Sequence, residues 1–324
     1  MARLQDRRAD ARRHLTRALE LHREVSDRRS EGRTLSHFSM LFHELGQEEP
    51  AREYGLTALR LHREVGDRRY EGVTLGNLGI LLQSHGRLDE ARASGLAALE
   101  IHRELGNIPA EGLTHIALGN LSRELSQPAQ SAAHFRQALH ILGEAGSPRL
   151  EGIAHTSLGG LYLELGRLAD AEQSFRQALA AFDVASEQLY SGLAHGGLAA
   201  AVALTGRLDE GEKELGTATE ILRAAAAPAF LDALDIYRAH VELAYVMSAT
   251  PARATELRAK VSARIRHAEG EPNPVGVGRQ APAARSEFVR AALRSYRTAE
   301  RIVQRAISKP PAKPAPKPAA RKSG

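Results

Sequence analysis

Apolar residues recur at three- and four-residue steps along most of this chain, as they do along the buried face of an amphipathic helix. The pattern is clearest between residues 62 and 105, where two such helices follow each other. Asp67 precedes the first helix and Gly86 separates the two, and these residue types are favoured before and after helices. We therefore expect an antiparallel helix pair with these residues turned inward: Leu75, Leu78, Leu81, Leu82, Ala91, Leu96, Ala98, Leu99 and Leu105.

The same helix pair recurs every forty residues. One glycine column marks the first helix of each unit: Gly32, Gly72, Gly112, Gly152 and Gly192. Two columns of small residues mark the second helix: Ala51, Ala91, Ser131, Ala171 and Gly211, then Ala58, Ala98, Ala138, Ala178 and Ala218. A fixed period in this range is typical of stacked helical repeats, in which each unit packs only on its neighbours. We therefore predict an all-α solenoid.

The pattern divides the chain into six parts. Residues 1–25 match only the second helix of a unit, and five complete units are expected over residues 26–225. A degenerate sixth helix pair is expected at 226–269, a Pro/Gly linker at 270–282 and a C-terminal capping helix at 283–308. The last part, 309–324, is rich in Lys, Pro and Ala and is expected to be disordered. Because the first helix lacks its partner, we expect another chain or an upstream domain to cover its apolar face.

Charge and composition narrow the classes of function. The net charge of +5 resides in residues 309–324, so the repeats themselves are neutral overall and are not a basic nucleic-acid-binding domain. Cysteine is absent, which excludes disulfides, thiolate metal sites and thiol nucleophiles. No apolar run reaches the roughly 20 residues of a membrane span, and the first fourteen residues lack the apolar core of a signal peptide. We therefore expect a cytoplasmic protein without a membrane span.

The columns resemble the tetratricopeptide repeat (TPR) family. Leu78 corresponds to the seventh position of that family's unit, and Gly79, Leu82, Ala91 and Ala98 to its eighth, eleventh, twentieth and twenty-seventh positions. Phe135 and Phe175 take the twenty-fourth position, and Tyr162 takes the eleventh. The forty-residue unit is similar to kinesin-light-chain repeats, and more so to the TPR regions of bacterial signalling ATPases, kinases and transcriptional activators. The resemblance covers about two thirds of the chain and implies a right-handed superhelix of antiparallel helix pairs.

The resemblance also implies a concave groove that binds protein or peptide ligands. The family's groove positions lie on the first helix of each unit. Carried over to this chain, they give these candidate binding residues: Arg33, His43, Ile80, Gln83, Ile116, Asn120, Arg123, Ile153, Thr156, Leu163, Glu164 and Leu193. The lysines with which chaperone-type members hold a peptide carboxylate are missing, so a helical or extended segment with an apolar side is the expected ligand. An alternative is that the C-terminal helix itself covers part of these apolar residues.

Other chemistry is poorly supported by the residues. Six histidines form two columns, at 22, 62 and 102 and at 115, 155 and 195, but packed helices lie about 8 to 10 Å apart, too far for shared zinc ligation along a column. We interpret the second column as packing within a unit and the first as a solvated or inter-repeat contact. The pair Asp89 and Glu90 is interpreted as helix capping, not as acid/base catalysis. No phosphate-binding glycine motif is present, so we expect no cofactor, no metal and no enzymatic activity.

Three hypotheses for function follow. The first is a non-enzymatic interaction module or scaffold of bacterial signalling, with the excess of Arg over Lys suggesting a GC-rich genome. The second is a sensor or regulatory fragment of a larger ATPase, kinase or transcriptional regulator whose effector domain lies upstream. The third is weak binding of nucleic acid or an anionic surface through the basic tail. Partner, pathway and oligomeric state stay open at this point.

Overall fold

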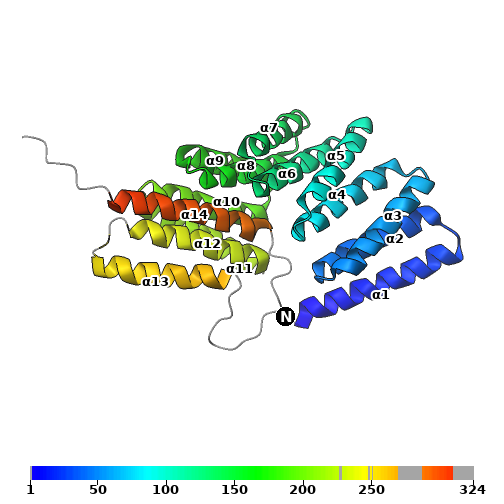
Figure 1. Cartoon of the computed structure of the whole chain (residues 1–324), viewed down its shortest axis with the longest axis horizontal. Helices are drawn as coiled ribbons and strands as arrows, with labels where there is room; N and C mark the ends of the chain where they lie inside the picture. Colours follow the sequence, from blue (N-terminus) through cyan, green and yellow to red (C-terminus); the bar gives the residue numbers. More distant parts are fainter. Residues whose placement is uncertain (1, 226–227, 247–248, 250, 269–286, 309–324) are drawn as a thin grey trace, which may run out of the picture.

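The computed structural model describes residues 2–225, 228–246, 249, 251–268 and 287–308. Within these ranges the chain is helical, with no strand (Figure 1). Ten helices form five antiparallel pairs: α2 (Arg28–Glu44) with α3 (Glu48–Glu64), α4 (Arg68–Ser84) with α5 (Leu88–Glu104), α6 (Ile108–Glu124) with α7 (Pro128–Glu144), α8 (Pro148–Glu164) with α9 (Leu168–Ala185), and α10 (Gln188–Leu204) with α11 (Leu208–Ala224). The others are α1 (Ala2–Glu24), α12 (Pro228–Tyr245), α13 (Pro251–Ala268) and α14 (Glu287–Ser308). The stretches predicted as linker and tail lie outside the described residues.

The turns that end α1 to α10 share one feature, a residue with positive φ. A residue with positive φ follows at intervals of twenty residues, where the chain reverses. Glycine adopts this conformation without a Cβ clash, which explains the turn glycines of the sequence. At the N-terminus of α4, the Asp67 side chain accepts a hydrogen bond from the Tyr70 amide at 3.4 Å, as expected of an N-cap. The residues with positive φ are Ser26, Gly46, Gly66, Gly86, Gly106, Ser126, Gly146, Gly166, Ser186 and Gly206.

The glycine column of the first helices is a contact between the two helices of each pair. A Cβ on Gly152 would lie 2.4 Å from the Phe182 ring, and one on Gly112 would lie 2.5 Å from Leu142. In the first two pairs a histidine takes the place of this large apolar side chain, and His62 there fills the space beside Gly32. The glycines that recur every forty residues therefore lie where a large side chain of the second helix packs directly against the backbone of the first helix.

A substitution at this column tests the close contact. Gly152→Ala is expected to lower the free energy of unfolding by about 1 to 3 kcal/mol, because Phe182 is fully buried and must move. Gly216→Ala is the matched control, since its Cβ would meet no atom within 4 Å; there we expect a gain of about 0.5 to 1 kcal/mol from helix propensity. Urea unfolding followed by circular dichroism measures both. Equal effects of the two substitutions would contradict the packing role.

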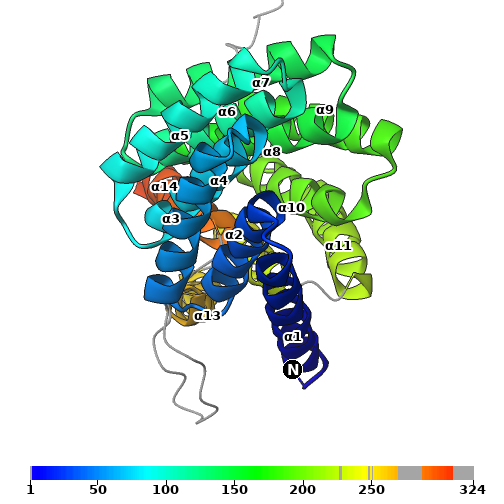
Figure 2. The same ribbon diagram turned by 90° about the vertical axis from the view of Figure 1, so that its right-hand side faces the viewer.

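The pairs stack side by side into a curved array. The first helices α2, α4, α6, α8 and α10 contact one another along the inner side, and α7, α9 and α11 lie at the outer edge of the arc when it is viewed end-on (Figure 2). α12 continues the inner row against α10. α14 packs on α12 and reaches back along the inner side to α8, so it lies within the arc (Figures 1 and 2). At the other end, α1 packs on α2 and exposes Leu21 and Val25.

The length and polarity of the helices bear on membrane insertion. Within the described residues, none of the helices has both the length and the apolar content needed to cross a lipid bilayer.

Candidate protein-binding groove

The inner side of α4 and α6 carries exposed apolar side chains. Val73 and Ile80 on α4 and Leu113 on α6 are 36%, 44% and 45% exposed. Residues seven apart lie on the same face of a helix, so Val73 and Ile80 form one row, and Leu113 occupies the equivalent of position 73 one unit later. We call the surface formed by Arg33, His43, Val73, Ile80 and Leu113 the open groove. Val73 and Leu113 are not among the twelve candidate binding residues named from the sequence, yet their exposed fractions are close to that of Ile80.

Charged residues border the open groove near the beginnings of its helices. Arg33 Nη2 lies 3.1 Å from Asp67 Oδ2, and its guanidinium lies 4.3 Å from the centre of the Tyr70 ring. Arg29 approaches the same carboxylate at 3.6 Å. Asp67 is buried and also caps α4, so its position is fixed by the turn. The arginine is therefore held in place while more than a third of its side chain remains accessible.

A histidine pair lies near the other ends of these helices. The rings of His43 and His85 are 6.4 Å apart, and His85 Nε2 lies 3.4 Å from a carboxylate oxygen of Glu48. His43 is partly exposed, whereas Gln83 beside it on the inner row is buried. This end of the open groove thus offers imidazole rings to a ligand, with one partner carboxylate close by.

Most of the candidate residues further along the row are buried. Ile153 and Glu164 are partly buried, and Thr156 donates its hydroxyl proton to Gly152 O at 2.8 Å. The neighbouring helices and α14 close over this part of the inner side. The buried members of the candidate set are Gln83, Ile116, Asn120, Arg123, Thr156, Leu163 and Leu193.

An ion-pair cluster lies under α14. Arg123 Nη2 is 2.5 Å from Glu164 Oε1, and the two side chains are only 3% and 12% exposed. The Arg123 Nη1 atom also lies 3.5 Å from Asn120 Oδ1. Arg294 of α14 brings its Nε within 2.9 Å of the same Glu164 oxygen and its Nη1 within 3.7 Å of Glu124. Four of these residues sit on the inner row, and the fifth arrives from α14.

α14 is fixed to both α8 and α12 by polar contacts as well as packing. Thr298 Oγ1 donates to the backbone carbonyl of Glu164 at 2.7 Å, at the last residue of α8. On α12, His240 Nε2 lies 3.1 Å from Ser295 Oγ, and its ring meets Tyr296 edge to face at 5.5 Å. Burial lowers the pKa of His240 to about 4, so this ring is neutral at pH 7.

Tyr237 of α12 is a second buried titratable group beside the cluster. Burial raises its pKa to about 12, with the Glu164 carboxylate adding to the rise and the Arg123 guanidinium opposing it. The phenol is therefore protonated over the physiological range. It fills the space over Gly196 of α10, where a Cβ would lie 2.9 Å from its ring. Its role in the described structure is packing between α10 and α12.

Three of the six column histidines, His62, His102 and His115, are buried, and the other three are partly exposed. His115 Nδ1 lies 3.0 Å from His134 Nδ1, and His195 Nδ1 lies 2.6 Å from Glu214 Oε2, both across the two helices of a unit, as expected for that column. His62 is fully buried, so its interpretation as solvated was wrong; it does stack on Tyr70 of the next unit at 5.6 Å. In the described ranges, no group of three or more His, Asp or Glu side chains has the arrangement of a metal site.

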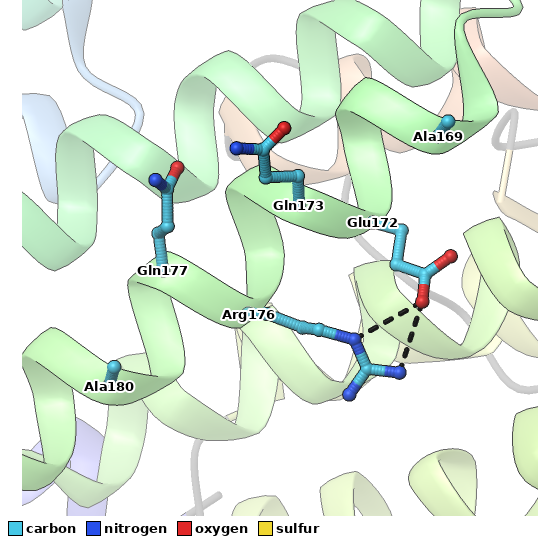
Figure 3. Close-up of a pocket in the computed structure, with 6 residues that line it drawn as sticks. All are labelled: Ala169, Glu172, Gln173, Arg176, Gln177 and Ala180. Carbon is cyan, nitrogen blue, oxygen red and sulfur yellow. Dashed lines mark hydrogen bonds and ion pairs between the residues drawn. The ribbon is translucent and has the colours of Figure 1, made fainter.

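A shallow depression on α9 offers no chemistry of its own. Its lining residues all come from one face of that helix, and their charged members are already paired (Figure 3). Arg176 Nη2 lies 3.1 Å from Glu172 and 2.6 Å from Glu210 on α11. Arg207 contacts both carboxylates as well. We interpret this surface as an ion-pair network that ties α9 to α11. The lining residues are Ala169, Glu172, Gln173, Arg176, Gln177 and Ala180.

Known proteins share this repeat and this fold. Tetratricopeptide-repeat family models match residues 70–144 and residues 154–181. BtubC from P. vanneervenii is similar in structure at a TM-score of 0.58 and 19% identity, over 69% of this chain and 92% of that chain. A second similar structure is a signal transduction ATPase with numerous domains (STAND) from Pyrococcus horikoshii, which has a tetratricopeptide repeat sensor. Its TM-score is 0.61 at 19% identity, over 79% of this chain and 40% of that chain. This chain thus spans less than half of that protein.

A Rap protein complexed with Competence and Sporulation Factor is also similar, at a TM-score of 0.58 and 14% identity, over 86% of this chain and 76% of that chain. At these identities the likeness concerns the fold alone. No curated protein matches the sequence.

Proposed function

We propose that this chain, in which tetratricopeptide repeats are matched over residues 70–144 and 154–181, is an interaction module whose open groove binds a peptide or a segment of another protein. The observation that carries the proposal is the row of exposed apolar side chains on the inner side of α4 and α6. Apolar side chains left in water add nothing to the stability of a helix-pair solenoid. A ligand that covers them removes their apolar surface from water, and this stabilises the complex. Arg33 beside this row suits a carboxylate of the ligand.

The finer proposal is a sensor or scaffold in a signalling assembly, acting in the cytoplasm of a bacterium and without catalysis of its own. Two structural relatives support it: the STAND protein has a tetratricopeptide repeat sensor, and the Rap protein is complexed with Competence and Sporulation Factor. The described titratable clusters support a non-enzymatic role, since they join helices to each other, as His195 and Glu214 do. A position downstream of an effector domain, and binding through the basic tail, stay predictions.

Substitution of the apolar row tests the groove. In the double variant Ile80→Glu and Leu113→Glu, we expect ligand affinity to fall at least about tenfold, because a bound apolar side chain would then face an unpaired carboxylate. The measurement is capture of partners from a lysate of the source organism by immobilised chain, followed by mass spectrometry and titration of each partner. Both residues are exposed, so the fold is expected to tolerate the change.

Leu96→Glu is the matched control. Leu96 lies on α5, the second helix of its unit, and is 48% exposed, so the substitution adds the same charge away from the groove. The prediction that Leu96 and Leu105 turn inward was wrong, since Leu105 is 45% exposed as well. Partners that bind in the open groove should be lost with the double variant and retained with Leu96→Glu. A partner set unchanged by the double variant would show that the open groove is not the binding surface.

A further inference from the structure

The inner surface of α8 and α12 is already a helix-binding surface in this molecule. α14 lies on it with a row of buried side chains, and the charged and hydroxyl groups of the same face meet partners on α6, α8 and α12. We propose that this surface is a docking site for an amphipathic helix of a partner protein that carries an arginine, and that α14 occupies it as an intramolecular stand-in. The inference goes beyond the open groove and holds whether or not that groove binds a ligand.

The first argument is charge complementarity. Glu124 and Glu164 present carboxylates from the last turns of α6 and α8, and Arg294 lies between them, 3.7 and 2.9 Å away. Arg123 holds Glu164 from the scaffold side at 2.5 Å. The acceptor for an incoming arginine is therefore positioned by the repeats themselves, independently of α14. A planar guanidinium suits two carboxylates better than a lysine ammonium does.

The second argument is a pair of hydroxyl contacts at fixed spacing from the arginine. Thr298, four residues after Arg294, donates to the carbonyl of Glu164. This residue ends α8, so no later turn of the helix supplies that carbonyl with a donor amide. Ser295, the next residue after Arg294, meets His240 of α12. The surface thus recognises an arginine followed by hydroxyl residues one and four positions later, on one helical face.

The third argument is the shape of the apolar contact. Ala292, Tyr296, Ala299 and Val303 follow each other at helical spacing and are each no more than 5% exposed. The two alanines, seven residues apart, let the helix backbone lie close to the surface, while Tyr296 packs on His240. Anchors at i, i+4, i+7 and i+11 are typical of an amphipathic helix bound in a groove.

These contacts define the partner by its chemistry. It presents a helix of about four turns with small residues seven apart, an arginine beside the first of them and a hydroxyl residue four positions after the arginine. Because α14 belongs to the same chain, it competes as an intramolecular ligand, so a partner must bind more tightly than α14 alone or add contacts elsewhere. Glu124 belongs to α6, which also borders the open groove, so one partner can use both surfaces.

The experiment uses the full chain and a labelled synthetic peptide of residues 287–308 as the probe. Arg294→Glu in the chain sets its own α14 against Glu124 and Glu164, and we expect this variant to bind the peptide at least about tenfold more tightly than the unaltered chain. Arg305→Glu, the same charge change at an exposed position of the same helix, is the matched control and should bind like the unaltered chain. A peptide with Arg294→Glu should bind the Arg294→Glu chain at least about tenfold more weakly than the natural peptide.

Three results would overturn the proposal. One is an Arg294→Glu chain that is folded by circular dichroism yet binds the peptide no better than the unaltered chain. Another is equal binding of the natural and the altered peptide, and a third is an equal gain for Arg305→Glu, which would indicate unspecific loosening.

Hydrogen exchange of the unaltered chain decides the matter if the Arg294→Glu chain does not fold. We expect the amides of residues 292–305 to exchange at least about tenfold faster than those of α8 and α12, because release of α14 is a local opening. Equal exchange rates would show that α14 opens only with the core, and would contradict its role as a stand-in.

Discussion

Replacement of Arg123 by alanine is expected to lower the free energy of unfolding by about 3 kcal/mol. This is the lower end of the range for removing one partner of a buried ion pair, because Arg294 continues to neutralise part of the Glu164 charge. The two paired side chains are almost fully buried, so water cannot replace the lost guanidinium. Urea unfolding followed by circular dichroism measures the loss. Since α14 shares Glu164, its amides should also exchange faster in this variant.

Two further variants identify the cause of that loss. Arg60→Ala removes one partner of an exposed pair, Arg60 and Glu64, and is expected to cost less than about 0.5 kcal/mol. The triple variant Arg123→Met, Glu164→Leu and Arg294→Met replaces Glu164 and both of its arginine partners with apolar groups and is expected to recover at least half of the loss. A single Arg123 variant no less stable than the Arg60 variant would contradict a buried ion pair. Failure of the triple variant to recover would assign the loss to packing.

Acidification from pH 7 to pH 5 is expected to destabilise the fold through its buried histidines. Burial lowers the pKa of His240 and His115 to about 4, with the neighbouring His134 and Arg103 adding to the effect at His115. An unfolded histidine binds its proton near pH 6.5, so between pH 6.5 and 4 the unfolded chain binds more protons than the folded one. The free energy of unfolding therefore decreases as the pH is lowered from 6.5 to 4, by up to about 3 kcal/mol per fully buried ring.

The carboxylates act at lower pH. Burial alone would raise the pKa of Glu71, but its hydrogen bonds to Arg63 and Arg68 outweigh this and lower it. Its contribution is therefore fully present above about pH 4.5 and is lost only as the pH falls through the lowered value. The loss between pH 6.5 and 5 thus belongs to the histidines.

His240→Gln tests the assignment. The amide keeps a hydrogen-bonding group near Ser295 but cannot take up a proton, so the difference in unfolding free energy between pH 7 and pH 5 should shrink by about 1 to 2 kcal/mol. His140→Gln, at a side chain 64% exposed, should leave that difference unchanged. An unaltered pH dependence in His240→Gln would contradict the buried, neutral state of His240.

The helices and turns were predictable because their determinants are local. Asp67 as an N-cap, Gly86 as a turn residue and the inward Ala91 and Ala98 each follow from a preference that acts within a few residues. Repetition at forty residues then multiplies each local preference into a column. A residue type that recurs at the same position in five units identifies the fold more securely than any single motif does.

The occupancy of the inner side was not predictable in the same way. Arg294 and Glu164 are 130 residues apart, and no period in the sequence relates the last helix to α8. The sequence left two possibilities open, a bare groove or one covered by its own helix, and only the packing decides between them. His62 was misjudged for a related reason: its equivalents Leu142 and Phe182 show an apolar site, but a histidine beside charged residues resembles a surface residue.

The position of α14 also sets the size of what can lie in the open groove. The main contacts of α14 are with α8 and α12 and it meets α6 at Glu124, so the uncovered part of the inner side is α2, α4 and the first turns of α6. Successive packed helices are separated by about 8 to 10 Å. The uncovered span is thus about 20 Å, which an extended segment crosses in about six residues at 3.3 Å per residue. Unless α14 is displaced, anything longer must turn away at α6, where Arg294 meets Glu124. While α14 is in place, the open groove therefore favours short segments or chain ends over the middle of a long extended chain.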